Sequence, residues 1–189
     1  MSMRQSLGES VLEVKPLLPE QWPLLKAVRL KALADAPEAF ATTLAQAQAW
    51  PDGEWQGRAR RFAADPPAAA YVAFLDGKPC GMVSCYSFQA DGHATGSVAE
   101  LTAFWVAPER RGQGAAQALI DRVVKWATAQ NITAVQAWVT EDGHRAIAFY
   151  EKTGFRETGQ RQAYTPDSSK QIILLARSLA PPDDCEEVQ

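Results

Sequence analysis

Two arginines and two glycines lie close together in the segment Arg110-Arg111-Gly112-Gln113-Gly114-Ala115-Ala116. Glycine adopts positive φ angles and lets a bulky ligand approach the backbone, which a Cβ atom would block. Where such a turn opens a helix, its unpaired backbone N–H groups and the positive end of the helix attract phosphate oxygens. The two arginines add positive charge. The segment therefore predicts a phosphate-binding loop.

The spacing of these residues narrows the choice of phosphate ligand. A nucleoside triphosphate loop needs Gly-Lys followed by Ser or Thr, and the chain contains no such triplet. The dinucleotide fingerprint needs a third glycine three places after Gly114, where this chain has Gln117. What remains is Arg-x-x-Gly-x-Ala from Arg111 to Ala116. A surface turn that caps a helix is the alternative interpretation of this loop alone.

The elements around the loop are those that position such a site. Residues 97–106 are rich in β-forming side chains and run directly into the loop. Residues 115–129 carry apolar side chains at helical spacing, and residues 133–139 predict a further strand. Residues 146–152 then predict a short helix that ends at Gly154. The loop is thus expected between a strand and a helix.

Two signatures in this stretch resemble the GNAT N-acyltransferase superfamily. Arg111 to Ala116 is similar to its pyrophosphate loop, and Tyr150-Glu151-Lys152-Thr153-Gly154-Phe155 is similar to its second signature. Both occur in the family's order, one predicted strand apart, so the resemblance covers residues 97–160. A less specific likeness to small bacterial members extends to residues 37–43 and to Glu54-Trp55.

The resemblance implies an α/β GNAT fold, with a central mixed, mostly antiparallel sheet of about seven strands flanked by about four helices. The remaining patterns fit this fold, with an Asp76-Gly77 hairpin turn and a second turn at 89–96. The other expected strands are 11–17, 69–75, 79–88, 156–163 and 171–177, and the other expected helices are 22–34 and 55–64. We expect a single acyltransferase domain over residues 1–180 and an acidic, flexible tail over 181–189.

The resemblance also implies an activity, namely acetyl-CoA-dependent N-acetyltransfer to a primary amine, directly within a ternary complex. Acetyl-CoA is then a co-substrate, no metal is needed, and the acceptor is a small-molecule amine or a protein amino group. The backbone N–H of Val106 is expected to polarise the thioester carbonyl. The expected coenzyme-binding residues are Phe104, Trp105, Val106, Arg111, Gly112, Gln113, Gly114, Ala115 and Ala116.

Acyl transfer to an amine needs a group that accepts a proton, because amines are mostly protonated near pH 7. Glu100, six residues before Val106, matches the catalytic glutamate of some members and is the candidate base. A salt-bridge role is the alternative, since an unpaired carboxylate in an apolar strand is costly. A regular strand would place four residues on one face, namely Glu100, Thr102, Phe104 and Val106, whereas a bulge, common in the family, would change that alternation.

Tyr150 matches the tyrosine that donates a proton to the coenzyme sulfur in the family, and a core tyrosine is the alternative. Many members have an asparagine seven residues earlier, where this chain has Gly143. His144 could replace that asparagine, although a histidine beside a glycine is usually a loop residue, as we also expect for His93.

The resemblance places the first helices beside the acceptor, so several N-terminal side chains become candidates for substrate contact. They are Trp50, Trp55, Arg58, Arg60 and Arg61. The alternative is that the tryptophans pack in the core and the arginines face solvent. No motif in this part of the chain identifies the acceptor.

Composition excludes several other classes. A net charge of −3 without a lysine-rich tract argues against nucleic-acid binding. No apolar run is long enough for a membrane span or a signal peptide, so a cytoplasmic protein is expected. Cys80, Cys85 and Cys185 lack metal-type spacing, so neither a zinc site nor a structural disulfide is expected.

Three functional classes stay open at this point: an active N-acetyltransferase, which we favour, a catalytically weak acetyl-CoA-binding regulatory module, and a protein that shares only the phosphate turn. A homodimer is also compatible with the resemblance, because many members dimerise, although no segment marks an interface.

Overall fold

The computed structural model describes residues 10–63, 68–89, 97–165 and 167–179. The strands are β1 (Leu12–Pro16), β2 (Ala68–Leu75), β3 (Lys78–Gln89), β4 (Ser97–Val106), β5 (Ile132–Thr140), β6 (Arg156–Tyr164) and β7 (Asp167–Ser178). The α-helices are α1 (Trp22–Asp35), α2 (Leu44–Gln48), α3 (Asp52–Arg61), α4 (Ala115–Ala129) and α5 (His144–Lys152). Three short 3₁₀ turns are η1 (Pro19–Gln21), η2 (Pro37–Ala39) and η3 (Pro108–Arg110).

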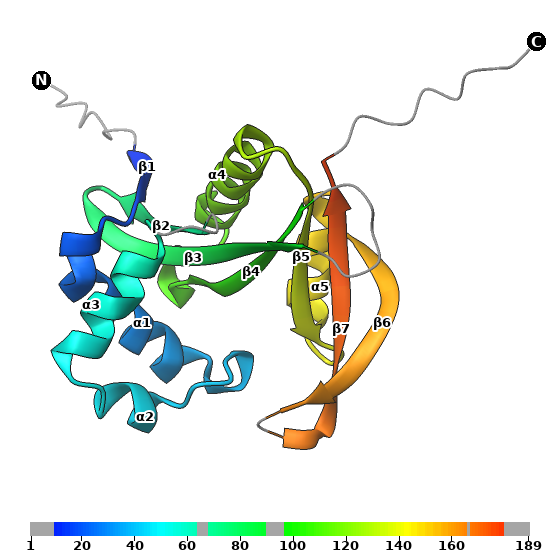
Figure 1. Cartoon of the computed structure of the whole chain (residues 1–189), viewed down its shortest axis with the longest axis horizontal. Helices are drawn as coiled ribbons and strands as arrows, with labels where there is room; N and C mark the ends of the chain where they lie inside the picture. Colours follow the sequence, from blue (N-terminus) through cyan, green and yellow to red (C-terminus); the bar gives the residue numbers. More distant parts are fainter. Residues whose placement is uncertain (1–9, 64–67, 90–96, 166, 180–189) are drawn as a thin grey trace, which may run out of the picture.

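All seven strands form one sheet in the order β1-β2-β3-β4-β5-β7-β6. Only β4 and β5 pair in parallel, and the other neighbours are antiparallel. The β4–β5 ladder runs only from Ser97 to Glu100, opposite Ile132 to Gln136, and the two strands then diverge (Figure 1). The predicted mixed, mostly antiparallel sheet is thus confirmed, with an opening in its middle.

Two apolar cores lie on the two faces of the sheet. Helices α4 and α5 contribute to one core, which includes Leu119, Val123 and Tyr150 together with β-strand residues such as Val135. The N-terminal helices α1 to α3 gather on the other side of the sheet and build the second core, which includes Trp55 (Figure 1). Strand β4 contributes side chains to both cores and therefore stands between them.

Most predicted elements are present, with three differences. The chain has five α-helices in the described residues rather than about four, because α2 is too short to show a helical period. Its start is nevertheless fixed by a capping box between Thr43 and Gln46. Helix α3 spans residues 52–61 rather than 55–64. The last two strands meet with fewer loop residues than predicted, since β7 begins at Asp167.

Several expectations fall outside the described residues, namely those for the 181–189 tail, the body of the 89–96 turn, His93 and Cys185. Within the described residues, none of the helices has the length and apolar character needed to cross a membrane. The same part of the chain holds no group of three potential His, Cys, Asp or Glu metal ligands. Cys80 and Cys85 are buried free thiols.

Candidate active site

The glycine loop before α4 presents a run of unpaired backbone donors. Gly112 and Gly114 have φ angles of +78° and +87°, the left-handed conformation that glycine favours. Gly114 is the N-cap residue of α4, and no side chain caps the helix there. Within the described part of the chain, the backbone N–H groups of residues 112–117 donate no hydrogen bond. The loop therefore forms a cradle of free donors suited to an anion, at the positive end of a 15-residue helix.

A groove of about 580 Å³ lies beside this cradle, between the end of β4, the loop and α5. Seven of the nine predicted coenzyme-binding residues line it: Phe104, Trp105, Val106, Arg111, Gly112, Gly114 and Ala116. The other two, Gln113 and Ala115, do not line the groove. The Gln113 side chain donates to the Glu109 carbonyl at 3.0 Å, and the Ala115 side chain is buried in the core. These two residues can face a ligand only through the backbone.

Sequence reasoning missed the other side of the groove. Arg145, Ala146, Phe149 and Lys152 line it from α5, together with Gln117 and Ala36. Positions 145, 149 and 152 recur at helical spacing and therefore share one face of α5. That periodicity was visible in the sequence and could have identified them. Arg145 and Lys152 make this wall of the groove positively charged.

Arg111 lines the groove, but its guanidinium is held by the protein. Its Nε donates to the Val106 carbonyl at 3.0 Å, and its Nη2 contacts Asp35 Oδ2 at 2.5 Å. The same Asp35 oxygen accepts a hydrogen bond from Trp105 Nε1 at 2.8 Å. Asp35 is the last residue of α1, so this cluster ties the N-terminal helices to the end of β4 and to the loop.

The backbone of Val106 faces the opening between β4 and β5. Ala107 N–H donates to the Cys80 carbonyl at 2.8 Å, across the pair formed by Gly81 and Val106. In an antiparallel ladder this identifies a non-hydrogen-bonded pair, so the N–H and C=O of Val106 point away from β3. They point to the side where β5 has already diverged. The Val106 N–H is therefore not used by the sheet, and Val106 lines the groove.

A β-bulge in β4 corrects the expected alternation of side chains. Ala103 has a φ angle of +52°, and the β3–β4 register shifts between Met82 and Ser84. The strand is therefore not regular, and the bulge that the prediction allowed for separates Glu100 and Thr102 from the face of Phe104 and Val106. Phe104 and Val106 contact the core under α4 and α5, whereas Thr102 and Ala103 line a cavity on the opposite side. The bulge lets one strand serve both sides of the sheet.

Glu100 is half-buried at the last rung of the β4–β5 ladder. Its Oε2 accepts a hydrogen bond from Gln136 Nε2 at 3.1 Å, and it makes no ion pair with any described residue. Its cross-strand partner on β3 is Tyr86, so the two side chains share a face. Glu100 lines neither the groove nor the opposite cavity but stands beside the latter.

Tyr150 lies on α5 with only 5% of its surface exposed. Its ring packs against Phe104, Phe149 and Phe155, with ring centroids 5.8, 5.8 and 5.1 Å away. Phe104 and Phe149 in turn line the groove. Burial raises the pKa of the Tyr150 hydroxyl well above its ordinary value, so the hydroxyl keeps its proton. The residue thus belongs to the core and borders the groove.

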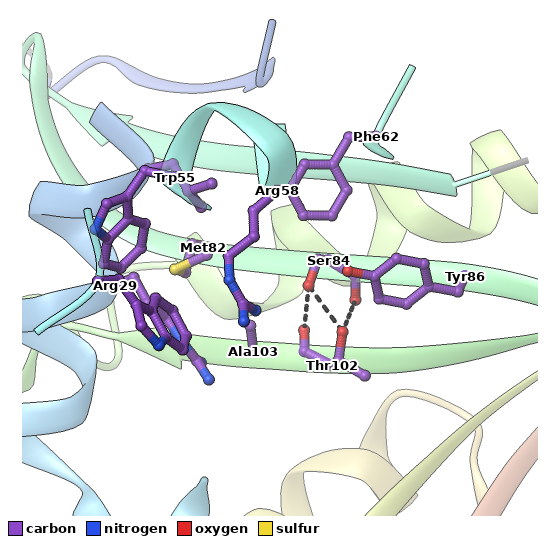
Figure 2. Close-up of a pocket in the computed structure, with 11 residues that line it drawn as sticks. Arg29, Trp55, Arg58, Phe62, Met82, Ser84, Tyr86, Thr102 and Ala103 are labelled. Carbon is purple, nitrogen blue, oxygen red and sulfur yellow. Dashed lines mark hydrogen bonds between the residues drawn. The ribbon is translucent and has the colours of Figure 1, made fainter. Parts of the chain in front are cut away.

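A second cavity, of about 220 Å³, lies between β3, β4 and the N-terminal helices (Figure 2). Three of the five substrate-side candidates, Trp50, Trp55 and Arg58, line it, whereas Arg60 and Arg61 are exposed. Sequence reasoning missed the other lining residues, which come from segments distant in the chain. They are Leu25, Arg29, Phe62, Met82, Ser84, Tyr86, Thr102 and Ala103.

Residues 30–155 match the sequence model of the Acetyltransferase (GNAT) family. The chain belongs to this family. An uncharacterized N-acetyltransferase of Mycobacterium tuberculosis is 34% identical over 124 residues, which cover 65% of this chain and 74% of that protein. An uncharacterized N-acetyltransferase of Methanocaldococcus jannaschii is 33% identical over 87 residues, 46% of this chain and 38% of that protein. N-acetylaspartate synthetase of Danio rerio is 35% identical over 95 residues, 50% of this chain and 32% of that protein.

These last two alignments thus span well under half of each relative's own length. Among solved structures, a GNAT-family acetyltransferase from Streptococcus pneumoniae has a TM-score of 0.71 at 19% identity, covering 90% of this chain and all of that one. PaiA N-acetyltransferase from Thermoplasma acidophilum, in complex with coenzyme A, has a TM-score of 0.66 at 16% identity. The match covers 89% of this chain and 99% of that one. The GNAT fold is therefore established for this chain, as predicted.

The departure at Gly143 has a steric cause in this GNAT chain. A Cβ atom at this position would lie 2.9 Å from both the carbonyl oxygen and Oγ1 of Thr140. Gly143 N–H also donates to that carbonyl at 2.8 Å, which closes a tight turn into α5. The asparagine that the resemblance led us to expect would therefore clash with Thr140 on the same backbone. His144 is exposed and does not line the groove.

Proposed function

We propose that this GNAT chain is an acetyl-CoA-dependent N-acetyltransferase that moves an acetyl group directly to a primary amine in a ternary complex. The observation that carries the proposal is the run of unpaired N–H groups over residues 112–117, which opens α4 beside the 580 Å³ groove. These donors suit the diphosphate of acetyl-CoA. We extend the proposal to one acyltransferase domain over residues 1–180.

The walls of the groove suit the rest of the coenzyme. Arg145 and Lys152 add positive charge beside the loop, where phosphate groups need it. Phe104 and Phe149 stack with their ring centroids 5.6 Å apart and offer an apolar surface to the pantetheine arm. The PaiA enzyme, which shares the fold, was solved in complex with coenzyme A. Acetyl-CoA is the substrate in this proposal, and the reaction requires no metal.

In the proposed reaction, the amine nitrogen forms a bond to the thioester carbonyl carbon and the carbon–sulfur bond breaks. Glu100 accepts the proton that the amine must lose, directly or through water. The Val106 N–H donates to the carbonyl oxygen, where negative charge develops during attack. Tyr150, whose raised pKa keeps it protonated, gives its proton to the departing thiolate.

Two measurements test this proposal. Calorimetry with acetyl-CoA should show one binding site for each chain, and no binding would overturn the proposal. A thiol-release assay over a panel of amines should then show steady turnover with at least one of them. Tight binding without turnover on any amine would instead favour a regulatory module that only binds the coenzyme.

Replacing the candidate base separates catalysis from binding. The substitution Glu100→Gln keeps the size of the side chain and removes its basicity, so kcat should fall by about 100-fold or more. The Kd for acetyl-CoA should not change, because Glu100 does not line the groove. Glu20→Gln, an exposed residue on η1, is the matched control. An unchanged kcat for Glu100→Gln would remove Glu100 from the mechanism.

A further inference from the structure

The smaller cavity concentrates positive charge. Arg29 of α1 and Arg58 of α3 both line it, whereas no acidic residue does. Arg29 makes no ion pair with any described residue, and its guanidinium lies 4.2 Å from the ring centroid of Phe40. This concentration is notable in a chain whose net charge is −3. The charge of the cavity is therefore a local property of its lining.

Some residues that line the cavity carry buried hydrogen-bond donors without a hydrogen-bond acceptor. Arg29 Nη1 and Trp55 Nε1 are buried without a hydrogen-bond partner in the described residues. Arg58 Nε lies 2.8 Å from Glu54 Oε1, but the geometry of that contact does not make a hydrogen bond. Buried donors are normally paired, because an unpaired one forfeits its bond to water. Of these, Arg29 Nη1 belongs to a charged group that makes no ion pair with any described residue, so a ligand that brings acceptor oxygens would satisfy it.

The charges around the cavity also favour a bound anion. Burial, and then the nearby charge of Arg58, lower the pKa of Arg29 to about 10. Arg29 is still charged at neutral pH, so two like charges face the cavity. Figure 2 shows Arg58 reaching down from α3 towards Ala103 of β4. A bound anion would offset both the repulsion between the arginines and the desolvation of Arg29.

We infer that the acceptor amine carries a carboxylate, which Arg29 and Arg58 bind, so that the substrate is a small amino acid or a similar amine. This inference rests on the proposed function and names its substrate class. A cavity of 220 Å³ corresponds to about seven water molecules. That space suits a small molecule, whereas a polyamine would meet two positive charges.

The strand register indicates how the acceptor would be oriented in the cavity. Ser84 and Thr102 form one cross-strand pair, and Tyr86 and Glu100 form the next pair along β3 and β4. Tyr86 lines the cavity, and Glu100 shares its face of the sheet. With its carboxylate at the arginines, the acceptor would direct its ammonium group towards Glu100. This is the end where β4 and β5 begin to diverge.

A panel of matched amines tests the inference. It contains α-amino acids, their carboxamides, aminoalkylphosphonates of equal length and polyamines. The value of kcat/KM should be about 10- to 100-fold higher for the carboxylates than for the carboxamides, because the carboxamide loses a charged hydrogen-bond partner. Preference for carboxamides or polyamines would overturn the inference. Preference for phosphonates would assign the site to phosphate and overturn it as well.

Two variants should abolish this discrimination. In Arg29→Gln and Arg58→Gln, the carboxylate-to-carboxamide ratio should fall to about threefold or less, mainly through KM for the acceptor. Arg60→Gln is the matched control, because this exposed arginine lies on the same helix as Arg58, does not line the cavity, and donates a hydrogen bond to Gln56. Glu54→Gln removes the carboxylate beside Arg58 and should keep the ratio. Should Arg29→Gln unfold, the half-buried Arg58 carries the test alone.

Coenzyme binding distinguishes a failure of the proposed function from a failure of the carboxylate inference. Each variant should bind acetyl-CoA with the wild-type Kd in calorimetry, because neither arginine lines the coenzyme groove. A wild-type protein that binds no acetyl-CoA would overturn the proposed function and this inference together. A wild-type protein that binds it and acetylates amines, while both variants keep the carboxylate preference, would overturn the inference alone.

Discussion

The groove proposed to bind the coenzyme and the cavity proposed to bind the acceptor both adjoin β4 and are built differently. The groove comes from two short stretches, residues 104–117 and 145–152, with Ala36 added, and its main donors are backbone N–H groups. The cavity gathers side chains from α1, α3, β3 and β4, and from Trp50 and Phe62 near the ends of α3. The groove thus depends on backbone conformation, whereas the cavity depends on side-chain identity.

This difference sets how each region should respond to substitution. A backbone cradle tolerates changes in most side chains as long as its glycines remain. A cavity of side chains changes its charge and shape with each substitution. We therefore expect variants of the two regions to separate cleanly, with groove variants altering coenzyme affinity and cavity variants altering acceptor choice.

The largest effect should follow from a side chain placed in the cradle. Gly114→Val puts a β-branched residue at a φ angle of +87° and places its Cβ 3.6 Å from Leu12. The loop must then shift, and its N–H groups lose their common direction. The Kd for acetyl-CoA should rise by about 100-fold or more, as expected for the loss of several charged hydrogen bonds. Calorimetry measures it.

Gly77→Val is the control for backbone strain. Gly77 has a φ angle of +74° in the β2–β3 hairpin, and a Cβ there has open space. Both variants should lose similar stability, about 1–2 kcal/mol, from the unfavourable φ angle. Only Gly114→Val should weaken coenzyme binding. Equal Kd values for the two variants would show that the loop does not hold the diphosphate.

The contrast between locally built and distantly assembled parts also explains how much of the molecule could be predicted from the sequence. The β4 and α4 bounds match the prediction because β-propensity, helical periodicity and two glycines specify them locally. The bulge at Ala103 has no such local signal, since alanine does not favour a positive φ angle. It arises from pairing with β3 and could be anticipated only from the family.

The acceptor cavity could not be assembled from sequence for a related reason. Arg29 lies on α1 between apolar core positions, and nothing in its neighbourhood distinguishes it from a surface arginine. It lines the cavity together with Ser84 and Thr102, which are more than fifty residues away in the chain and share the cavity only because of the fold. The predicted candidate Arg58 was found because the resemblance, rather than a motif, placed α3 beside the acceptor.

A substitution of Tyr150 tests whether this residue acts in catalysis or only packs in the core beside the groove. Tyr150→Phe removes only the hydroxyl and keeps the ring contacts with Phe104 and Phe155. Steady-state kinetics should show a fall in kcat of about tenfold or more, with water replacing the lost acid, and an unchanged Kd for acetyl-CoA. Tyr164→Phe on β6 is the matched control. An unchanged kcat would place Tyr150 among the packing residues.

Asp35 should couple the two regions weakly. It accepts hydrogen bonds from Trp105 and Arg111 at the groove, and it ends the helix that carries Arg29 to the cavity. Asp35→Asn removes the charge that holds Arg111, so the Kd for acetyl-CoA and the KM for the acceptor should both rise by about threefold to tenfold. Asp52→Asn, at an exposed ion pair with Lys26, is the control. A change in only one constant would show that the sites are independent.

The smallest expected effect on activity at neutral pH comes from changing Cys85, a core residue of β3. Ser84 and Tyr86 face the cavity, whereas Cys85 between them is fully buried under α4, and burial raises the pKa of its thiol from 9 to about 12. Above pH 9 the unfolded chain releases this proton and the folded chain does not. Stability should therefore fall as the pH rises from 9 towards 12, by up to about 1.4 kcal/mol per pH unit.

Cys85→Ala isolates this contribution. The variant should be somewhat less stable at pH 7, because a buried sulfur is lost, but its stability should fall less steeply above pH 9. Urea unfolding at pH 8, 9, 10 and 11 measures both curves. Activity at pH 7 should stay within about twofold of wild type, since Cys85 lines neither site. Parallel curves above pH 9 would mean that the thiol ionises in the folded protein and that this face of β3 is open to solvent.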